Sequence, residues 1–316
     1  MPPDPRTAGP RLIEAERKMK AGQLAEGVTD LEGIYADWPH GPPASRCLFL
    51  LALAAYQVKD RARAIRFMRG AIGEGDTITK ELSARGHFNG ATRRKVQESQ
   101  ANAYYNLGCF VHEEGETAEA KRCYETALQL DPANSQSLGN LGNVHLEEGN
   151  TAEAIRCYEK VTRLGGITAR EAIYNRGLAR LLIGDYARGW PDYEERHEMP
   201  MWLQEYARKE LTPQHRWRGK PIPGKRLLLT AEQGFGDTIM MVRFRDAVAA
   251  RSQAELTWEV QPQLLSLLRA NLPDQVIARG APLPEHDAWL SLMSLPFVCG
   301  LKRPADIPPA PYLKAA

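Results

Sequence analysis

The sequence lacks the features that mark several large classes of protein. Its 41 lysines and arginines nearly balance its 39 aspartates and glutamates, so no excess of one charge predicts binding to nucleic acid. The longest strongly apolar run, Cys47 to Tyr56, is far shorter than the roughly 20 residues that span a bilayer. The first twenty residues contain no apolar core of a signal peptide. We therefore expect neither a nucleic-acid partner nor a membrane span.

Patterns for metal and nucleophile chemistry are also missing. The five cysteines include no CxxC pair, and the seven histidines form no HxxxH or HExxH pattern, so we predict no metal and no cofactor. No GxSxG motif surrounds a serine. An odd number of scattered cysteines is typical of a reducing compartment. A length of 316 residues is too great for one small module, and together these features predict a soluble, cytoplasmic protein of more than one domain.

What the sequence does contain is an internal repeat. Two segments near 101–134 and 135–168 align without a gap, so Gly108 and Gly142 are separated by 34 residues, as are Tyr124 and Tyr158. A third copy near 170–203 has one inserted residue, and weaker copies lie near 8–41 and 45–78. We interpret the long polar interval 77–100 as an extra helix or an elongated connection with a solvated face, in preference to a basic phosphate-contacting patch.

Each repeat has the pattern of two helices joined by a tight turn. Gly108 removes a side chain where a second helix must approach, and Gly115 suits a turn with positive φ. Ala120, Tyr124 and Ala127 recur at the spacing of one buried helical stripe. The period and the pattern resemble the tetratricopeptide repeat (TPR), so we expect a solenoid over residues 1–203 that binds a protein or peptide.

Three asparagines occupy the same register of successive repeats. Asn106, Asn140 and Asn175 each precede a repeat glycine by two residues. Stacked repeats would align them, and their amides could pair with the backbone of an extended peptide. This arrangement resembles the asparagine ladder of O-GlcNAc transferase. In the alternative interpretation, each amide only hydrogen-bonds a neighbouring helix.

The pattern changes after the repeats. Residues 204–224 are rich in proline and polar groups, as in a linker or a packed surface extension. Residues 225–316 then alternate strands, expected at 225–231, 254–260, 276–280 and 288–292, with helices at 239–250 and 264–270. This alternation predicts a parallel sheet. The fold class is therefore mainly α: a TPR α-solenoid followed by a small Rossmann-like α/β half-domain. We also expect Trp190 and Tyr193 to join the last repeat to the sheet.

One loop of the α/β region carries a candidate site. Residues 233–238 follow a strand and open a helix, where backbone N–H groups and the helix dipole favour an anion. A nicotinamide site is disfavoured because Ile239 stands where the third glycine of the dinucleotide fingerprint belongs, although Glu259 could imitate the ribose-binding acid. Asp237 can equally be a simple helix cap.

Three segments carry a further resemblance, namely 184–196 (GDYARGWPDYEER), 216–229 (RWRGKPIPGKRLLL) and 231–244 (AEQGFGDTIMMVRF). Together they look like bacterial TPR proteins fused to a GT-B glycosyltransferase domain, similar to heptosyltransferases and, more distantly, to O-GlcNAc transferase. The resemblance implies that Asp237 is a general base, which a sugar hydroxyl needs in order to attack. It also implies that Gly234, Gly236 and Thr238 belong to the acceptor or anion loop.

The resemblance also implies that residues 225–316 correspond to only the first half of a GT-B domain, and that the family's nucleotide-sugar donor binds mainly to the second half. We therefore expect a protein-binding scaffold with an incomplete, acceptor-side glycosyltransferase-like domain that is inactive as this chain alone, with a glycan acceptor possible. The alternative is a fragment of a glycosyltransferase that acts on a protein or glycan acceptor and needs a C-terminal half beyond Ala316.

Overall fold

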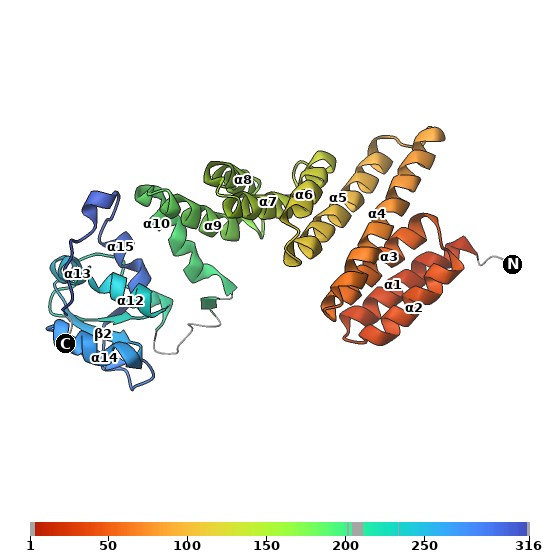
Figure 1. The fold of residues 1–316 in the computed structure, drawn as a ribbon. Helices are drawn as coiled ribbons and strands as arrows, with labels where there is room; N and C mark the ends of the chain where they lie inside the picture. Colours follow the sequence, from red (N-terminus) through yellow and green to blue (C-terminus); the bar gives the residue numbers. More distant parts are fainter. Residues whose placement is uncertain (1–3, 201, 204–210, 233, 315–316) are drawn as a thin grey trace. The chain divides into compact units, whose positions relative to one another are not determined.

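The computed structural model describes residues 4–200, 202–203, 211–232 and 234–314. It divides into two compact units, Met1–Thr168 and Ala169–Ala316 (Figure 1). The division falls before the third copy of the strong repeat, so this helix pair packs as part of the unit that contains the sheet. The solenoid expected over 1–203 is thus divided between the two units.

The first unit is made of helices that pack in consecutive pairs. A short 3-10 turn at Pro5–Thr7 precedes them. The helices are α1 (Ala8–Lys20), α2 (Leu24–Asp37), α3 (Gly41–Gln57), α4 (Arg61–Ala84), α5 (Gly90–Glu113), α6 (Thr117–Leu130), α7 (Ser135–Glu147) and α8 (Thr151–Leu164).

A glycine–tyrosine contact recurs where the paired helices meet. A Cβ atom built on Gly108 would lie 2.6 Å from Cε1 of Tyr124, and one built on Gly142 would lie 2.6 Å from Cε1 of Tyr158. Both tyrosines are completely buried. The glycines of α5 and α7 therefore leave the space that the rings of α6 and α8 fill, as the repeat pattern predicts.

The turns within the pairs use a residue in the left-handed region. Gly115 and Gly149 have φ values of 84° and 78°. At the equivalent place between α3 and α4, Lys59 adopts a φ of 63°, which non-glycine residues rarely do. The weak repeat near 45–78 thus keeps the turn although its sequence lacks the glycine.

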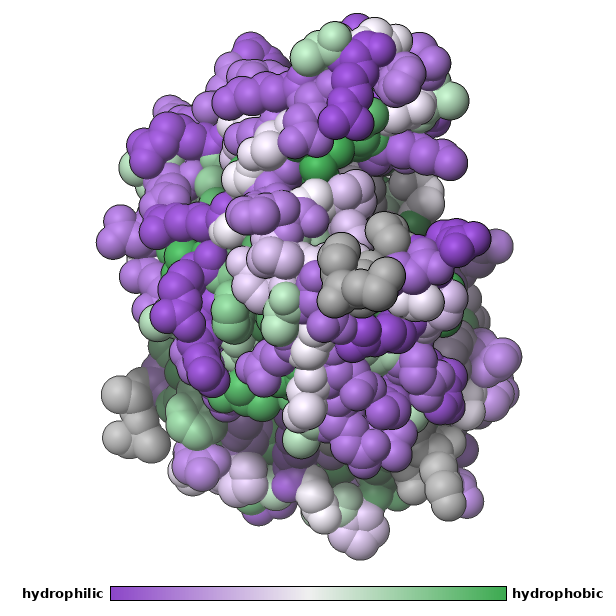
Figure 2. All heavy atoms as spheres, turned by 90° about the vertical axis from the view of Figure 1, so that its right-hand side faces the viewer, coloured by the Kyte–Doolittle hydropathy of each residue, from purple (hydrophilic) through white to green (hydrophobic). Residues whose placement is uncertain are grey.

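The interval 77–100 is a continuation of the neighbouring helices. Helices α4 and α5 are each 24 residues long, so together they take up most of this interval and leave a short turn at 85–89. No separate helix forms among these described residues. Seen from the side of the N-terminal helices, the surface is mainly hydrophilic, with apolar residues showing in the gaps (Figure 2). Within the interval, Arg85, His87, Arg93, Arg94 and Lys95 are all exposed, so its polar face is solvated, as the sequence predicts.

The second unit begins with α9 (Ala169–Leu182) and α10 (Tyr186–Tyr193), followed by a 3-10 helix η2 (Glu194–Glu198). The expected linker 204–224 is described from residue 211 onward, with a 3-10 turn η3 at Pro213–His215. Four strands follow, β1 (Arg226–Thr230), β2 (Glu255–Val260), β3 (Gln275–Ala278) and β4 (Ala288–Ser291). Between and after them lie α12 (Phe235–Val242), α13 (Arg245–Ser252), η4 (Pro262–Leu264), α14 (Leu265–Asn271), η5 (Leu292–Ser294), α15 (Leu295–Val298) and η6 (Pro304–Asp306).

The four strands form one parallel sheet in the order β3-β2-β1-β4. Leu227, Leu228 and Leu229 of the central strand β1 are completely buried, as expected for a strand that is covered on both faces. The fold class predicted from the sequence is confirmed: helical repeats and a small parallel sheet. The helix expected over 239–250 is in fact two helices, α12 and α13, which are separated at residues 243–244.

One apolar core joins the last helix pair to the sheet. Trp190 and Tyr193 of α10 belong to the same buried cluster as Leu227 and Leu229 of β1 and Trp258 of β2. The role predicted for this aromatic pair is confirmed. The helix pair α9–α10 therefore shares a core with the sheet, which explains its place in the second unit.

The glycine–tyrosine contact gives a test of the repeat packing. Replacing Gly108 or Gly142 with alanine should destabilise the protein by about 1–3 kcal/mol, because the new methyl group overlaps a buried ring. Gly139 is the control, since a Cβ atom there meets nothing within 4 Å. Gly139→Ala should stabilise helix α7 by up to about 1 kcal/mol. Urea unfolding measures both effects, and similar changes in all three variants would contradict the contact.

Candidate functional site

The second unit has a pocket at the carboxyl edge of its sheet. The cavity measures roughly 400 Å³, within the range of small-molecule sites. Its lining includes Thr230 and Glu232 from the end of β1 and Ser291 from the end of β4. Trp202 and Arg216, from the segments between η2 and β1, line it as well.

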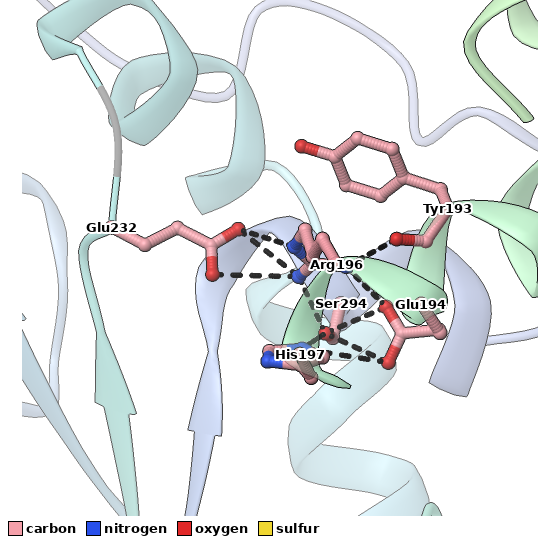
Figure 3. Close-up of polar contacts among 6 residues, drawn as sticks. All are labelled: Tyr193, Glu194, Arg196, His197, Glu232 and Ser294. Carbon is pink, nitrogen blue, oxygen red and sulfur yellow. Dashed lines mark hydrogen bonds and ion pairs between the residues drawn. The ribbon is translucent and has the colours of Figure 1, made fainter. Parts of the chain in front are cut away.

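A buried arginine organises the residues next to this pocket (Figure 3). Arg196 of η2 is only 1% exposed. Its guanidinium donates to Glu232 Oε1 through Nε and Nη2 at 3.2 and 3.0 Å, and to Glu194 Oε1 through Nη1 at 2.7 Å. Nη2 also donates to Ser294 Oγ at 2.8 Å. One cation thus binds two carboxylates and a hydroxyl group from three segments of the chain.

His197 completes the network on the pocket side. Its Nε2 lies 3.1 Å from Ser294 Oγ, and that hydroxyl group donates to Glu194 Oε1 at 2.8 Å. The indole of Trp202 packs over this layer, edge to face with the His197 ring at 5.8 Å between centroids and 5.4 Å from the Arg196 guanidinium carbon. The polar cluster is therefore closed off by an aromatic ring.

Burial shifts the ionisation of two lining groups that belong to this network, Glu232 and His197. Burial raises the pKa of Glu232 to about 7, against the opposing effect of Arg196. Burial, together with the nearby cations Arg196, Arg216 and Arg218, lowers the pKa of His197 to about 2. His197 is therefore neutral at ordinary pH and can only exchange hydrogen bonds. Glu232 is the group whose charge can change near neutrality.

The loop that the sequence singled out lies beside this cluster. Asp237 is in the first turn of α12, and its Oδ2 accepts a hydrogen bond from the backbone N–H of Gly234 at 3.0 Å. The side chain thus caps its own helix, the simpler of the two roles considered from the sequence. One N–H group expected to bind an external anion is therefore already occupied. The general-base role of Asp237 stays a prediction, and Gln233 lies outside the described residues.

The other loop residues have different surroundings. Thr238 is buried, and its Oγ1 donates to Gln261 Oε1 at 2.9 Å, which attaches the loop to the end of β2. A Cβ atom on Gly236 meets nothing within 4 Å, so the fold itself does not require glycine there. Glu259 is fully buried in β2, where it has no access to a ribose. Its predicted imitation of a ribose-binding acid does not agree with this burial.

The three asparagines predicted to line a groove are divided between the units: Asn106 and Asn140 lie in the first and Asn175 in the second. Asn106 donates to the Asn102 carbonyl of its own helix at 2.7 Å. Asn140 donates to Tyr124 Oη at 3.4 Å and to Cys109 Sγ at 3.3 Å, the neighbouring-helix contact considered as the alternative. Asn175 lies on α9 of the second unit. A peptide ladder through the three stays a prediction.

A second cavity lies in the first unit, where α4 and α5 extend past α3. It measures roughly 270 Å³. Phe49, Ile78, Leu82 and Val96 supply apolar surface, and basic and polar residues complete the lining. We call this cavity the helical groove. The long helices that the sequence left as an interval between repeats therefore create a concave apolar surface.

The described residues were also searched for metal sites and for membrane-spanning helices. No group of three or more His, Cys, Asp or Glu side chains in it is arranged to hold a metal ion. None of its helices has the length and apolar character needed to cross a bilayer.

Sequence reasoning missed the Arg196 network. Its members are spread from residue 194 to residue 294 and share no motif spacing. One signal was present: Glu232 follows directly on the apolar segment 227–231, where an acidic side chain at the end of a buried strand needs a partner. Arg196 itself stands out only as the last residue of the segment 184–196.

The ionisation of His197 is testable. In the folded protein its ring should show no titration between pH 5 and 8, because burial lowers its pKa to about 2. The ring should titrate near its ordinary value in urea. Two-dimensional NMR of the imidazole carbons, assigned with His197→Gln, measures both states. A folded-state midpoint above pH 5 would contradict the neutral ring.

The same shifts predict how stability depends on pH. The lowered pKa of His197 gives a stabilising contribution that is present above its ordinary pKa of 6.5 and lost as the pH falls towards about 2. The raised pKa of Glu232 has the opposite sign, with stability present below 4.5 and lost as the pH rises through about 7. The two effects oppose each other between pH 4.5 and 6.5.

Comparisons with known proteins concern the helical repeats. Two family models, both described as tetratricopeptide repeat, match residues 99–165 and 140–197. Protein FlbA of Caulobacter vibrioides is 30% identical over 102 residues, which are 32% of this chain and 17% of FlbA. The chain therefore spans 17% of the length of that relative.

Solved structures with similar helices include the MamA protein, with a TM-score of 0.47, 18% identity and coverage of 66% of this chain and 98% of MamA. They also include YrrB, a TPR protein with an unusual peptide-binding site, with a TM-score of 0.43, 13% identity and coverage of 62% and 89%. The family models confirm the predicted repeats. Residues 99–197 of this chain contain tetratricopeptide repeats.

Proposed function

We propose that this protein is a TPR scaffold that binds a protein partner through a short peptide segment in the helical groove. The observation that carries the proposal is the apolar cavity among α3, α4 and α5. TPR solenoids present concave surfaces of stacked helices to extended ligands. An apolar side chain of the peptide would enter between Phe49 and Val96, where burial of apolar area favours binding.

The charges at the groove suggest which peptide would bind. Lys95 lines the cavity and is exposed, whereas Arg46 is already paired with Glu16 at 2.7 Å. A peptide with an apolar anchor and a neighbouring acidic residue would match this arrangement, since rim charges steer association more than they add affinity.

Selection from a random peptide library, followed by fluorescence polarisation, tests the proposal. Val96→Asp should weaken the selected peptides at least tenfold, because it introduces a charge into the apolar cavity. Val58→Asp is the matched control, since Val58 is 62% exposed on the same unit and does not line the groove. Equal affinity of the two variants, with melting temperatures near that of the wild type, would exclude the groove as the binding site.

The asparagine register is a separate arm of the same experiment. If amides bind the peptide backbone, replacing Asn106, Asn140 and Asn175 with alanine should abolish binding and leave the protein folded. Unchanged affinity in this variant would remove the ladder from the proposal while leaving the helical groove intact.

A second candidate function is sugar transfer, with Asp237 as general base for an acceptor hydroxyl group. The observation that favours it is the position of Asp237, half-exposed in the first turn of α12 just after the central strand. The Asp237 carboxylate is close enough to the pocket to help raise the pKa of Glu232. Together with the resemblance to GT-B domains, this supports an acceptor-side half-domain that would act with a donor-binding partner half.

The base role predicts a specific loss. In protein purified from its native source and incubated with nucleotide sugars, Asp237→Asn should lower transfer to a hydroxyl acceptor by about 10²–10⁴-fold. Asp246→Asn, whose side chain is 93% exposed on α13, should leave the rate unchanged. Equal rates in wild type and Asp237→Asn, or no transfer by the wild type, would count against this second function.

A further inference from the structure

Two polar groups in the pocket of the second unit lack partners. The guanidinium of Arg216 is half-buried and makes no hydrogen bond or ion pair with the described residues. Ser291 is 3% exposed, and no described group bonds to its Oγ. Both residues line the same cavity. Unpaired groups at such positions are costly, and a bound ligand would satisfy both.

The topology makes this the expected place for a ligand. From β1 the chain moves outward on one side through β2 and β3, and then returns to add β4 on the other side. The order therefore reverses between β1 and β4. Thr230 and Ser291, which are register partners at the carboxyl ends of these strands, both line the pocket. In open α/β sheets ligands bind at such a switch point.

The charges around the pocket favour an anion, because Arg216 and Arg279 both line it. Glu232 is already bound to Arg196, and Glu198 lies 3.5 Å from Arg170, so the two lining carboxylates have partners. The guanidinium of Arg216, in contrast, has no described carboxylate within ion-pair distance. The lowered pKa of Arg216, caused by burial and then by neighbouring Arg218, is consistent with an unsatisfied cation.

The rest of the wall is apolar and held in place. Trp202, Leu211 and Trp289 line the cavity, and Leu211 is buried. The Trp289 indole N–H donates to the Thr212 carbonyl at 2.8 Å, and the backbone N–H of Trp217 donates to the Trp289 carbonyl at 2.8 Å. A ligand would therefore meet a preformed surface and lose little affinity to reorganisation.

We propose that this pocket binds a small organic carboxylate with an apolar or aromatic body. The carboxylate accepts paired hydrogen bonds from the planar guanidinium of Arg216 and one from the hydroxyl group of Ser291, and the body packs against Trp202 and Trp289. This site is independent of peptide binding, because the helical groove belongs to the first unit.

The test compares phenylacetate with its neutral amide, phenylacetamide, in NMR titrations of the full chain that follow the indole N–H signals of Trp202 and Trp289. Phenylacetate should bind at least tenfold more tightly than the amide. Arg216→Gln should remove this preference, and Ser291→Ala should weaken phenylacetate several-fold. Arg218→Gln is the matched control, since Arg218 is exposed and does not line the pocket, and it should keep the preference.

Three outcomes would overturn the proposal. Equal affinity for the acid and the amide would show that the pocket does not recognise a carboxylate. If Arg218→Gln lost the preference for phenylacetate as well as Arg216→Gln, the preference would come from the overall positive charge rather than from paired hydrogen bonds with Arg216. Stronger competition from inorganic phosphate than from phenylacetate would assign the pocket to another class of anion. Melting curves of each variant distinguish lost binding from lost folding, and none of these results bears on the peptide assay.

Discussion

The second unit depends on the burial of one arginine. A guanidinium that is 1% exposed must have its charge and its donors satisfied inside the protein. Arg196 finds them on Glu194 beside it, on Glu232 after β1 and on Ser294 after β4. The last helix pair and two strands of the sheet are therefore joined by polar contacts as well as by the apolar core.

This polar connection also shapes the chemistry nearby. Because Arg196 bonds both glutamates, the lining carboxylate of Glu232 already has a cationic partner inside the protein. His197, kept neutral by burial and by surrounding cations, cannot supply a charge. The groups left for a ligand are those outside the network, Arg216 and Ser291. The fixed cluster thus forms one wall of the pocket, and the unpaired groups give it a chemical preference.

The first unit follows a simpler rule, because its repeats pack through shape. Gly108 and Gly142 make room for completely buried tyrosine rings, so the distance between helices is set by one missing Cβ atom. Where the repeat is interrupted, α4 and α5 lengthen, and their extra turns form the helical groove. The departure from the repeat, rather than the repeat itself, creates the concave apolar surface proposed to bind a peptide.

The sequence by itself determined the repeats, their glycine–tyrosine contacts and the parallel sheet, because each depends on periodicities of neighbouring residues along the chain. It also identified Asp237, whose helix-capping contact with Gly234 spans three residues. The tertiary structure alone decided the rest. Arg196 and Ser294 are 98 residues apart in sequence, and Arg216 and Ser291 line one pocket only because β4 returns to the far side of β1. No local sequence pattern predicts these long-range contacts, because they depend on the order of the strands and on which residues are buried together.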